Sequence, residues 1–246
     1  MRLKDKVAVV TGAAQGIGQA VAVRLASEGA RIAIADLVSS ERTRNLIIEA
    51  GGQCIDQIVD VSSPEQVQAF ALNVQSKWGD THVLVNNAGI YPQTAFEDIS
   101  YEDWKRLFAI NVDSQFLMAQ ALVPGMKRHQ WGRIINISSA SFWLNSQRLV
   151  NYVSTKAASI GFTHALAGEL GAFGITVNAV APSLVSTETA KKSPLSQRFD
   201  LVPTLQSIPL LQRPEDLGGV VAFLASQDAA FITGQVIAAD GGLTRH

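Results

Sequence analysis

A tyrosine and a lysine stand four residues apart in the segment Tyr152-Val153-Ser154-Thr155-Lys156. The segment has a helical pattern, and this spacing places both side chains on one helix face, about 6 Å apart along the axis. A phenol with an ordinary pKa of about 10 exchanges protons poorly at neutral pH. A lysine cation one turn away favours the phenolate, which would make Tyr152 a general acid or base. By itself such a pair is weak evidence, because most are surface pairs.

Other polar residues follow predicted strands. The run Asn86-Asn87-Ala88-Gly89 comes after one apolar run, Ser138-Ser139 ends another, and Asn111 lies in a helical segment. In an open α/β sheet, the carboxyl ends of parallel strands line the crevice in which ligands bind. We therefore expect these side chains to gather around a ligand.

A glycine-rich turn with the spacing G-x-x-x-G-x-G, Gly12 to Gly18, follows the first apolar run. It is a relative of the dinucleotide fingerprint, in which glycines permit a tight turn and let backbone N–H groups approach a pyrophosphate. The pyrophosphate would lie at the N-terminus of a helix that begins near Ile17. The glycines alone also fit a turn without a ligand.

An aspartate, Asp36, ends the second apolar run. There a carboxylate can accept hydrogen bonds from both hydroxyls of an adenosine ribose. Its negative charge repels a 2′-phosphate, and residues 13–15 and 37–38 contain no cation. We therefore expect NAD(H) rather than NADP(H). The turn and Asp36 alone would still permit an S-adenosylmethionine-dependent methyltransferase.

The elements that must position these residues alternate along the chain. Short apolar runs predict strands, several of them continuously apolar as in a parallel sheet buried on both faces: Val7–Thr11, Ile32–Asp36, Cys54–Asp60, Val83–Asn86, Arg133–Ser138, Ile175–Ala181 and Gln235–Asp240. Longer amphipathic stretches predict helices: Ile17–Glu28, Pro64–Trp78, Tyr101–Met126 and Tyr152–Ala172. This alternation indicates βαβ units and an α/β fold.

No repeat or linker divides the 246 residues, so we expect one domain over residues 1–246. The least regular stretch, residues 183–214, contains Pro194, Pro203, Pro209 and Pro214. A loop of that length inside a compact domain is usually functional. We expect it to close over the site as a lid.

The composition argues against several classes of function. The net charge of −1 comes without a Lys/Arg stripe, which disfavours nucleic-acid binding. One cysteine, Cys54, and four scattered histidines favour neither a disulfide nor a metal site. No apolar run approaches the roughly 18 residues of a membrane span, and Val7–Val10 is short for a signal-peptide core. We expect a cytoplasmic protein that binds neither membrane nor nucleic acid.

Together the motifs resemble the short-chain dehydrogenase/reductase family. The resemblance covers the whole chain, in TGAAQGIG (residues 11–18), NNAG (86–89), Asn111, Ser139, YVSTK (152–156) and TGQVIAADGG (233–242). It implies a single Rossmann-type, doubly wound, seven-stranded parallel sheet flanked by helices on both faces. It also implies assembly as a homotetramer.

The resemblance assigns catalytic roles. Tyr152 would exchange a proton with the substrate oxygen while hydride moves between the substrate carbon and the nicotinamide, and Ser139 would stabilise charge on the same oxygen. Lys156, with the charge of the oxidised nicotinamide, would lower the pKa of Tyr152 and also bind the nicotinamide ribose. Asn111 would hold a water that relays protons. The expected catalytic set is Asn111, Ser139, Tyr152 and Lys156.

The resemblance also implies which residues hold NAD(H): Gly12, Gln15, Gly16, Ile17 and Gly18 at the pyrophosphate, Asp36 at the ribose, Asp60 and Val61 at the adenine, Asn87, Ala88 and Gly89 along the adenosine ribose, and Tyr152, Lys156, Pro182, Val185 and Thr187 at the nicotinamide. Ser183 stands where the family usually has glycine. If that position needs a positive φ, a serine costs about 1 kcal/mol or more, so the lid would have a different shape.

The substrate pocket is expected among residues after Gly89, after Ser139 and in the lid: Tyr91, Ser141, Phe142, Trp143, Leu184 and Phe199. Aromatic walls without an internal cation favour a compact apolar ketone or secondary alcohol. Residues 90–92, 123–128, 131–136 and 181–185 and the ending Arg245-His246 resemble the 1-phenylethanol dehydrogenases and related carbonyl reductases. That resemblance implies an aryl ketone/1-arylethanol couple.

Two other interpretations stay open. A 3-oxoacyl thioester (acyl-carrier) reductase would use basic groups to bind its carrier, and would typically use NADPH; the adjacent pair Lys191-Lys192 in the lid is the feature that suggests it. A non-catalytic dinucleotide-binding sensor would not need the set Ser139, Tyr152 and Lys156.

Overall fold

The computed structural model describes residues 1–245. Its strands form one seven-stranded sheet in the order β3-β2-β1-β4-β5-β6-β7, and every neighbouring pair is parallel. The strands are β1 (Val7–Thr11), β2 (Arg31–Asp36), β3 (Gln53–Ile58), β4 (Val83–Asn86), β5 (Gly132–Ile137), β6 (Ile175–Pro182) and β7 (Val236–Ala239). Strands β1, β4, β5 and β6 are buried along their whole length, as a sheet covered on both faces requires.

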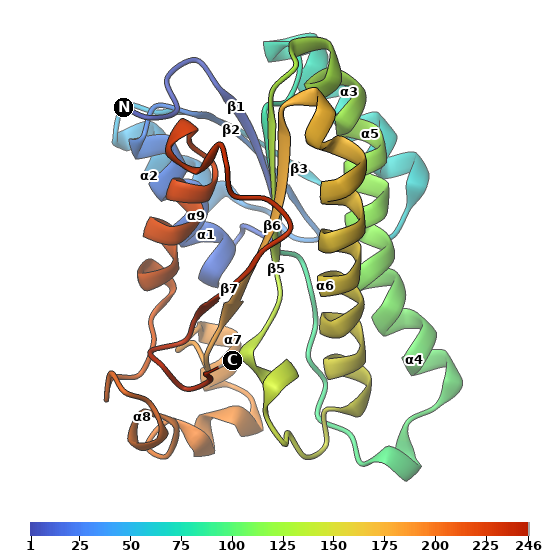
Figure 1. Ribbon diagram of the computed structural model, residues 1–246, viewed down its shortest axis with the longest axis vertical. Helices are drawn as coiled ribbons and strands as arrows, with labels where there is room; N and C mark the ends of the chain where they lie inside the picture. The colour runs from blue at the N-terminus through green and yellow to red at the C-terminus, as the bar shows by residue number, and fades with distance from the viewer. Residues whose placement is uncertain (246) are drawn as a thin grey trace.

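Helices cover both faces of the sheet (Figure 1). One face packs against α1 (Gly16–Ser27), α2 (Glu41–Glu49) and α9 (Gly218–Leu224), and the other against α3 (Pro64–Trp78), α5 (Ser114–His129) and α6 (Val150–Leu170), with α4 (Tyr101–Phe108) preceding α5. Short helices α7 (Glu188–Lys191) and α8 (Val202–Leu205) lie in the segment 183–214, near the turn that follows β5 (Figure 1). Short 3-10 turns cover Phe96–Asp98, Ala140–Trp143, Gly171–Phe173, Pro194–Arg198, Pro214–Leu217 and Gln227–Ala229.

The predicted doubly wound parallel sheet is confirmed, and each predicted strand end lies within two residues of the observed end. The order of the strands reverses between β1 and β4, which creates the crevice at their carboxyl ends. Within residues 1–245, no helix combines the length and the apolarity that crossing a membrane requires.

The segment Tyr101–Met126, predicted to be helical, is helical throughout and continues to His129, but the helix is not regular. Helix α4 ends at Phe108, a wider π-helical turn covers Ala109–Asp113, and α5 begins at Ser114. The side chain of Asn111, inside this turn, bonds to the backbone of Ile90 after β4. These contacts compensate for the irregular turn, and such turns are frequent at functional sites.

Candidate active site

A cavity of about 690 Å³ opens at the carboxyl ends of the central strands. Its walls come from the glycine turn after β1, the ends of β2 and β3, the segments after β4 and β5, the first turns of α6, and residues 182–202. Of the residues expected to bind the cofactor, all but Gly18 line it. Ser139, Tyr152 and Lys156 line it as well, whereas Asn111 lies behind the wall.

The glycine turn has the shape that a bound dinucleotide needs. Gly12 and Gly16 adopt φ values of +64° and +61°, which residues other than glycine rarely adopt. A Cβ on Gly12 would stand 2.8 Å from Ala88 Cα, and one on Gly18 would overlap the carbonyl of Gly12. Gly18 therefore serves the internal packing of the turn, which explains why it does not face the cavity. The Asn87 amide supports the same turn by donating to Gly12 O at 2.8 Å.

The N-terminus of α1 is left open toward the cavity. Gln15 is its N-cap residue, but the Gln15 side chain makes no capping hydrogen bond. Instead, Gln15 Nε2 donates to Thr189 Oγ1 of the segment 183–214 at 3.1 Å. The N–H groups of the first turn of α1 are thus available to a phosphate, so the glycine turn fits a pyrophosphate.

Asp36 lies beside this turn with its carboxylate held in place. One carboxylate oxygen accepts the Ala14 N–H at 2.8 Å, and the other accepts the Val38 N–H at 3.2 Å. A carboxylate oxygen can accept more than one hydrogen bond, so both keep capacity for the hydroxyls of a ribose. The residues present fit the adenosine half of a nicotinamide dinucleotide.

Lys156 is buried, with an exposed fraction of 5 %. Its ammonium group donates to Ile137 O at 2.8 Å and lies 5.6 Å from the centre of the Tyr152 ring. Burial lowers the pKa of Lys156 to about 8, because the charged form loses its hydration. The lysine and the phenol are therefore together, one helical turn apart, as the spacing predicts.

The expected lowering of the Tyr152 pKa does not occur in the protein alone. Burial raises the pKa of Tyr152 to about 12, and a hydrogen bond with Ser139 acts in the opposite direction but is the smaller effect. Desolvation disfavours the phenolate more than the neighbouring groups stabilise it. An oxidised nicotinamide would supply the positive charge that the buried Lys156 does not provide alone.

Asn111 is fully buried in the π-helical turn. Its amide oxygen accepts the Ile90 N–H at 2.9 Å, and its amide nitrogen donates to Ile90 O at 2.9 Å and to Thr155 Oγ1 at 3.1 Å. The side chain thus joins the segment after β4 to helix α6, next to the backbone of Tyr152. The water relay through Asn111 stays a prediction.

Three of the six residues expected in the substrate pocket line the cavity. Tyr91, Ser141 and Leu184 line the cavity, whereas Phe142, Trp143 and Phe199 do not. Phe142 and Trp143 pack edge to face, with ring centres 5.2 Å apart, on the turn after β5. Their apolarity indicated a buried environment but could not tell which side of the turn they occupy.

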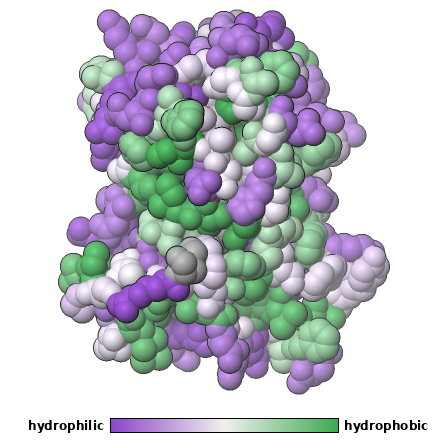
Figure 2. Space-filling model, viewed as in Figure 1, coloured by the Kyte–Doolittle hydropathy of each residue, from purple (hydrophilic) through white to green (hydrophobic). Residues whose placement is uncertain are grey.

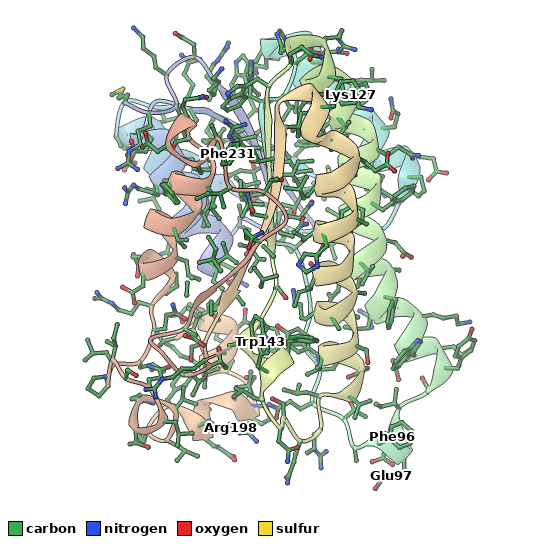
Figure 3. All side chains as sticks on the ribbon, in the orientation of Figure 1. Phe96, Glu97, Lys127, Trp143, Arg198 and Phe231 are labelled. Carbon is green, nitrogen blue, oxygen red and sulfur yellow. The ribbon has the colours of Figure 1, made fainter. Side chains whose placement is uncertain are left out.

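The cavity contains two cations that the sequence analysis did not place there. Arg106 of α4 and Arg198 of the segment 183–214 both line it, which corrects the expectation of a pocket without a cation. Neither forms an ion pair within the part of the chain that the structure describes. Figure 3 shows Arg198 at the same end of the molecule as Trp143. Its position in the predicted lid was the signal available for Arg198, and no signal pointed to Arg106.

Ser183 does not need the backbone conformation of glycine. It is not among the described residues with a positive φ, so the expected strain is absent. Its N–H donates to Gln212 Oε1 at 2.9 Å, and its hydroxyl donates to Gln206 Oε1 at 2.6 Å. Ser183 therefore anchors the beginning of the segment 183–214 to its far end.

Comparisons with known proteins agree with this geometry. The family model described as enoyl-(acyl carrier protein) reductase matches residues 12–244. The chain is 38 % identical to the 3-oxoacyl-[acyl-carrier-protein] reductase FabG of Pseudomonas aeruginosa, covering 99 % of each. It is 35 % identical to the (2S)-[(R)-hydroxy(phenyl)methyl]succinyl-CoA dehydrogenase subunit BbsD of Thauera aromatica, covering 98 % of each.

Among solved structures, a short-chain dehydrogenase/reductase from Serratia marcescens superposes with a TM-score of 0.92 at 32 % identity, covering 100 % of both chains. The match extends over the sheet, the glycine turn and the segment that carries Tyr152 and Lys156. With the family model and the curated relatives, it establishes that this chain belongs to the short-chain dehydrogenase/reductase family of oxidoreductases.

Proposed function

We propose that this protein uses NAD(H) to interconvert a ketone and a secondary alcohol. The observation that carries the proposal is a single cavity with Ser139, Tyr152 and Lys156 in its wall and the fixed carboxylate of Asp36 beside the glycine turn. The residues around the glycine turn, Asp36 and Lys156 would hold the cofactor, whose reduced nicotinamide would supply a hydride, with its two electrons, to the carbonyl carbon. Tyr152 gives its proton to the carbonyl oxygen, so the ketone becomes the alcohol, and both transfers reverse on oxidation.

The other two residues support this proton transfer. Ser139 offers a hydroxyl hydrogen bond to the oxygen on which negative charge develops. Lys156, held at Ile137 O, favours the phenolate that remains after Tyr152 has given up its proton. The high pKa of Tyr152 in the protein alone keeps the phenol protonated, as the reducing direction requires.

The substrate class with most support is a 3-oxoacyl thioester. The P. aeruginosa relative is named for a 3-oxoacyl group on acyl carrier protein, and the T. aromatica relative for a coenzyme A thioester. Arg106 and Arg198 in the cavity lining add a physical argument, because a phosphopantetheine carrier has a phosphate that an arginine binds well. This alternative of the sequence analysis thus has more support than the aryl ketone.

A small aryl ketone such as acetophenone is the second candidate. The apolar side chains of Leu184, Leu195, Val202 and Leu243 line the cavity and would accept a ring that carries no charge. Asp36 supports NAD(H) in both cases, although acyl-carrier reductases typically use NADPH.

A substrate and cofactor screen tests the proposal. Reduction of acetoacetyl-CoA and of acetophenone is measured with NADH and with NADPH, from the absorbance of the reduced cofactor. We expect kcat/KM with NADH to be at least about tenfold higher for the thioester, which corresponds to about 1.4 kcal/mol. A faster reaction with acetophenone would support the second candidate, and no oxidation of either cofactor by any ketone would reject the proposed function.

We propose further that the protein assembles as a homotetramer. Large apolar side chains remain exposed on the single chain, among them Phe116 of α5 (50 %) and Phe231 before β7, which is fully exposed. Apolar residues gather over α9 and β7 on the face in Figure 2, and Phe231 is labelled in Figure 3. Exposed apolar patches of this kind mark protein interfaces. Light scattering coupled to size exclusion should give four times the chain mass of 26.3 kDa.

A further inference from the structure

Ser141 makes two hydrogen bonds to the hydroxyl oxygen of Ser139. The backbone N–H of Ser141 donates to Ser139 Oγ at 3.2 Å, and the hydroxyl of Ser141 donates to the same oxygen at 2.9 Å. Both residues belong to the turn after β5, in which Ser139 caps the 3-10 segment Ala140–Trp143, and both line the cavity.

This arrangement restricts what the Ser139 hydroxyl can do. A hydroxyl has one hydrogen to donate and two lone pairs that accept. If Ser141 occupies both lone pairs, the hydrogen of Ser139 must be donated to a third atom. We take the phenol oxygen of Tyr152, which lines the same cavity, as that atom, since hydrogen bonding with Ser139 lowers the pKa of the phenol.

We propose that Ser141 is a positioning residue that holds the Ser139 hydroxyl as a hydrogen-bond donor, directed at the Tyr152 oxygen or, when substrate is bound, at the substrate oxygen. This inference rests on the proposed function and assigns Ser141 a role other than contact with substrate. Such a donor stabilises negative charge on the oxygen that accepts its hydrogen. Without the Ser141 hydroxyl, Ser139 can rotate its hydrogen away and accept from Tyr152, which stabilises the protonated phenol and no longer stabilises the phenolate or the charge on the substrate oxygen.

The two contacts of Ser141 can be separated by mutation. The backbone bond to Ser139 Oγ does not depend on the side chain, so Ser141→Ala keeps the cap of the turn and removes only the hydroxyl. Ser141→Thr keeps the hydroxyl. Ser154→Ala is the matched control, because its hydroxyl donates only to Val150 O within α6, outside the cavity.

The experiment measures kcat and KM against pH in both directions, together with the Kd of NADH. For Ser141→Ala we expect kcat to fall about ten- to a hundredfold with KM and the Kd of NADH within about twofold. The apparent pKa that limits alcohol oxidation should rise by about half a unit to one unit, since the phenolate loses a donor. Ser141→Thr should restore most of kcat, and Ser154→Ala should match the wild type.

Two outcomes would overturn the inference: an unchanged kcat and pH profile in Ser141→Ala, or a Ser141→Thr variant as impaired as the alanine variant. A wild-type protein that turns over no ketone or alcohol in the same assay would instead reject the proposed function. The two failures are therefore distinguishable.

Discussion

The Asp36 carboxylate and the backbone of Ala14 are joined by a hydrogen bond of 2.8 Å. This bond fastens the end of β2 to the glycine turn after β1, so the charge expected to select the cofactor also fixes the loop expected to hold its pyrophosphate. A change of charge at this position must therefore preserve the bond if its effect on the cofactor is to be read cleanly.

Asp36→Asn meets that condition, since one amide oxygen can still accept the Ala14 N–H while the negative charge is lost. We expect the ratio of kcat/KM for NADH over NADPH to fall by about ten- to a hundredfold, because a charge-assisted bond to the ribose disappears and repulsion of a 2′-phosphate ends. Initial rates with both cofactors measure the ratio. Asp228→Asn, at an exposed position, is the control, and an unchanged ratio in Asp36→Asn would contradict the assignment to NAD(H).

Tyr152→Phe should lower kcat by about a thousandfold or more, because the ring remains but no hydroxyl exchanges a proton with the substrate. The Kd of NADH, followed by fluorescence titration, should change little. Tyr101→Phe, on the exposed surface of α4, provides a tyrosine control. Turnover near the wild-type rate in Tyr152→Phe would exclude the phenol as the proton donor.

The two directions of the reaction should depend on pH with opposite sign. Oxidation needs the phenolate and Tyr152 has a raised pKa of about 12, so kcat/KM for the alcohol should increase with pH from neutral upward. Reduction needs the protonated phenol and should change little until high pH. Lys156 has a pKa of about 8, so its cation is present mainly below that pH, and Lys156→Gln should lower the oxidation rate most in the lower half of the range. Profiles over about pH 6 to 10 measure this, and an oxidation rate that falls with pH would contradict it.

His82 should make the fold sensitive to acid. Its Nδ1 accepts the Val7 N–H at 3.2 Å, and burial, followed by the charges of Lys6 and His129, lowers its pKa from 6.5 to about 4. The unfolded chain therefore binds the proton more readily, so stability present above pH 6.5 is lost as the pH falls toward about 4.

His82→Asn keeps an acceptor for the Val7 N–H but has no group that titrates in this range. Over this pH window, the Tm of the wild type should fall more than that of the variant, measured by calorimetry. If the Tm of the wild type and that of His82→Asn fall in parallel, the acid sensitivity comes from other groups, Asp80 among them.

The Ser183 hydroxyl should hold the segment 183–214 closed over the cavity. Ser183→Gly removes its 2.6 Å bond to Gln206 and gives the backbone more freedom. We expect KM for the ketone to rise severalfold with a smaller change in kcat, and trypsin to cleave the segment faster at Lys191, Lys192 or Arg198. Unchanged KM and cleavage would show that this anchor does not control the segment.

The sequence predicts the sheet well because its central strands are buried on both faces. Short apolar runs such as Val7–Thr11 and Val83–Asn86 are typical of buried parallel strands, and their predicted ends match the observed strands. Helical periodicity likewise brings Tyr152 and Lys156 to one face of α6. These features depend on local pattern, which is what a sequence displays directly.

Features that depend on the path of the chain were not predicted. Apolarity alone could not show that Phe142 and Trp143 are not part of the cavity wall, nor could spacing show that Arg106 is part of it. The pKa of Tyr152 depends on how much water the finished cavity removes, so a neighbouring lysine in the sequence could not determine it.

The π-helical turn at Ala109–Asp113 has a consequence for the length of the chain. A wide turn holds one residue more than the regular helix it interrupts, and one residue of an α-helix corresponds to a rotation of about 100°. Deleting a single residue between α4 and α5 would let the two helices merge, while Asn111 would swing away from Ile90. Deletion of one residue from this turn should therefore disturb the structure behind Tyr152 more than a substitution in the turn would.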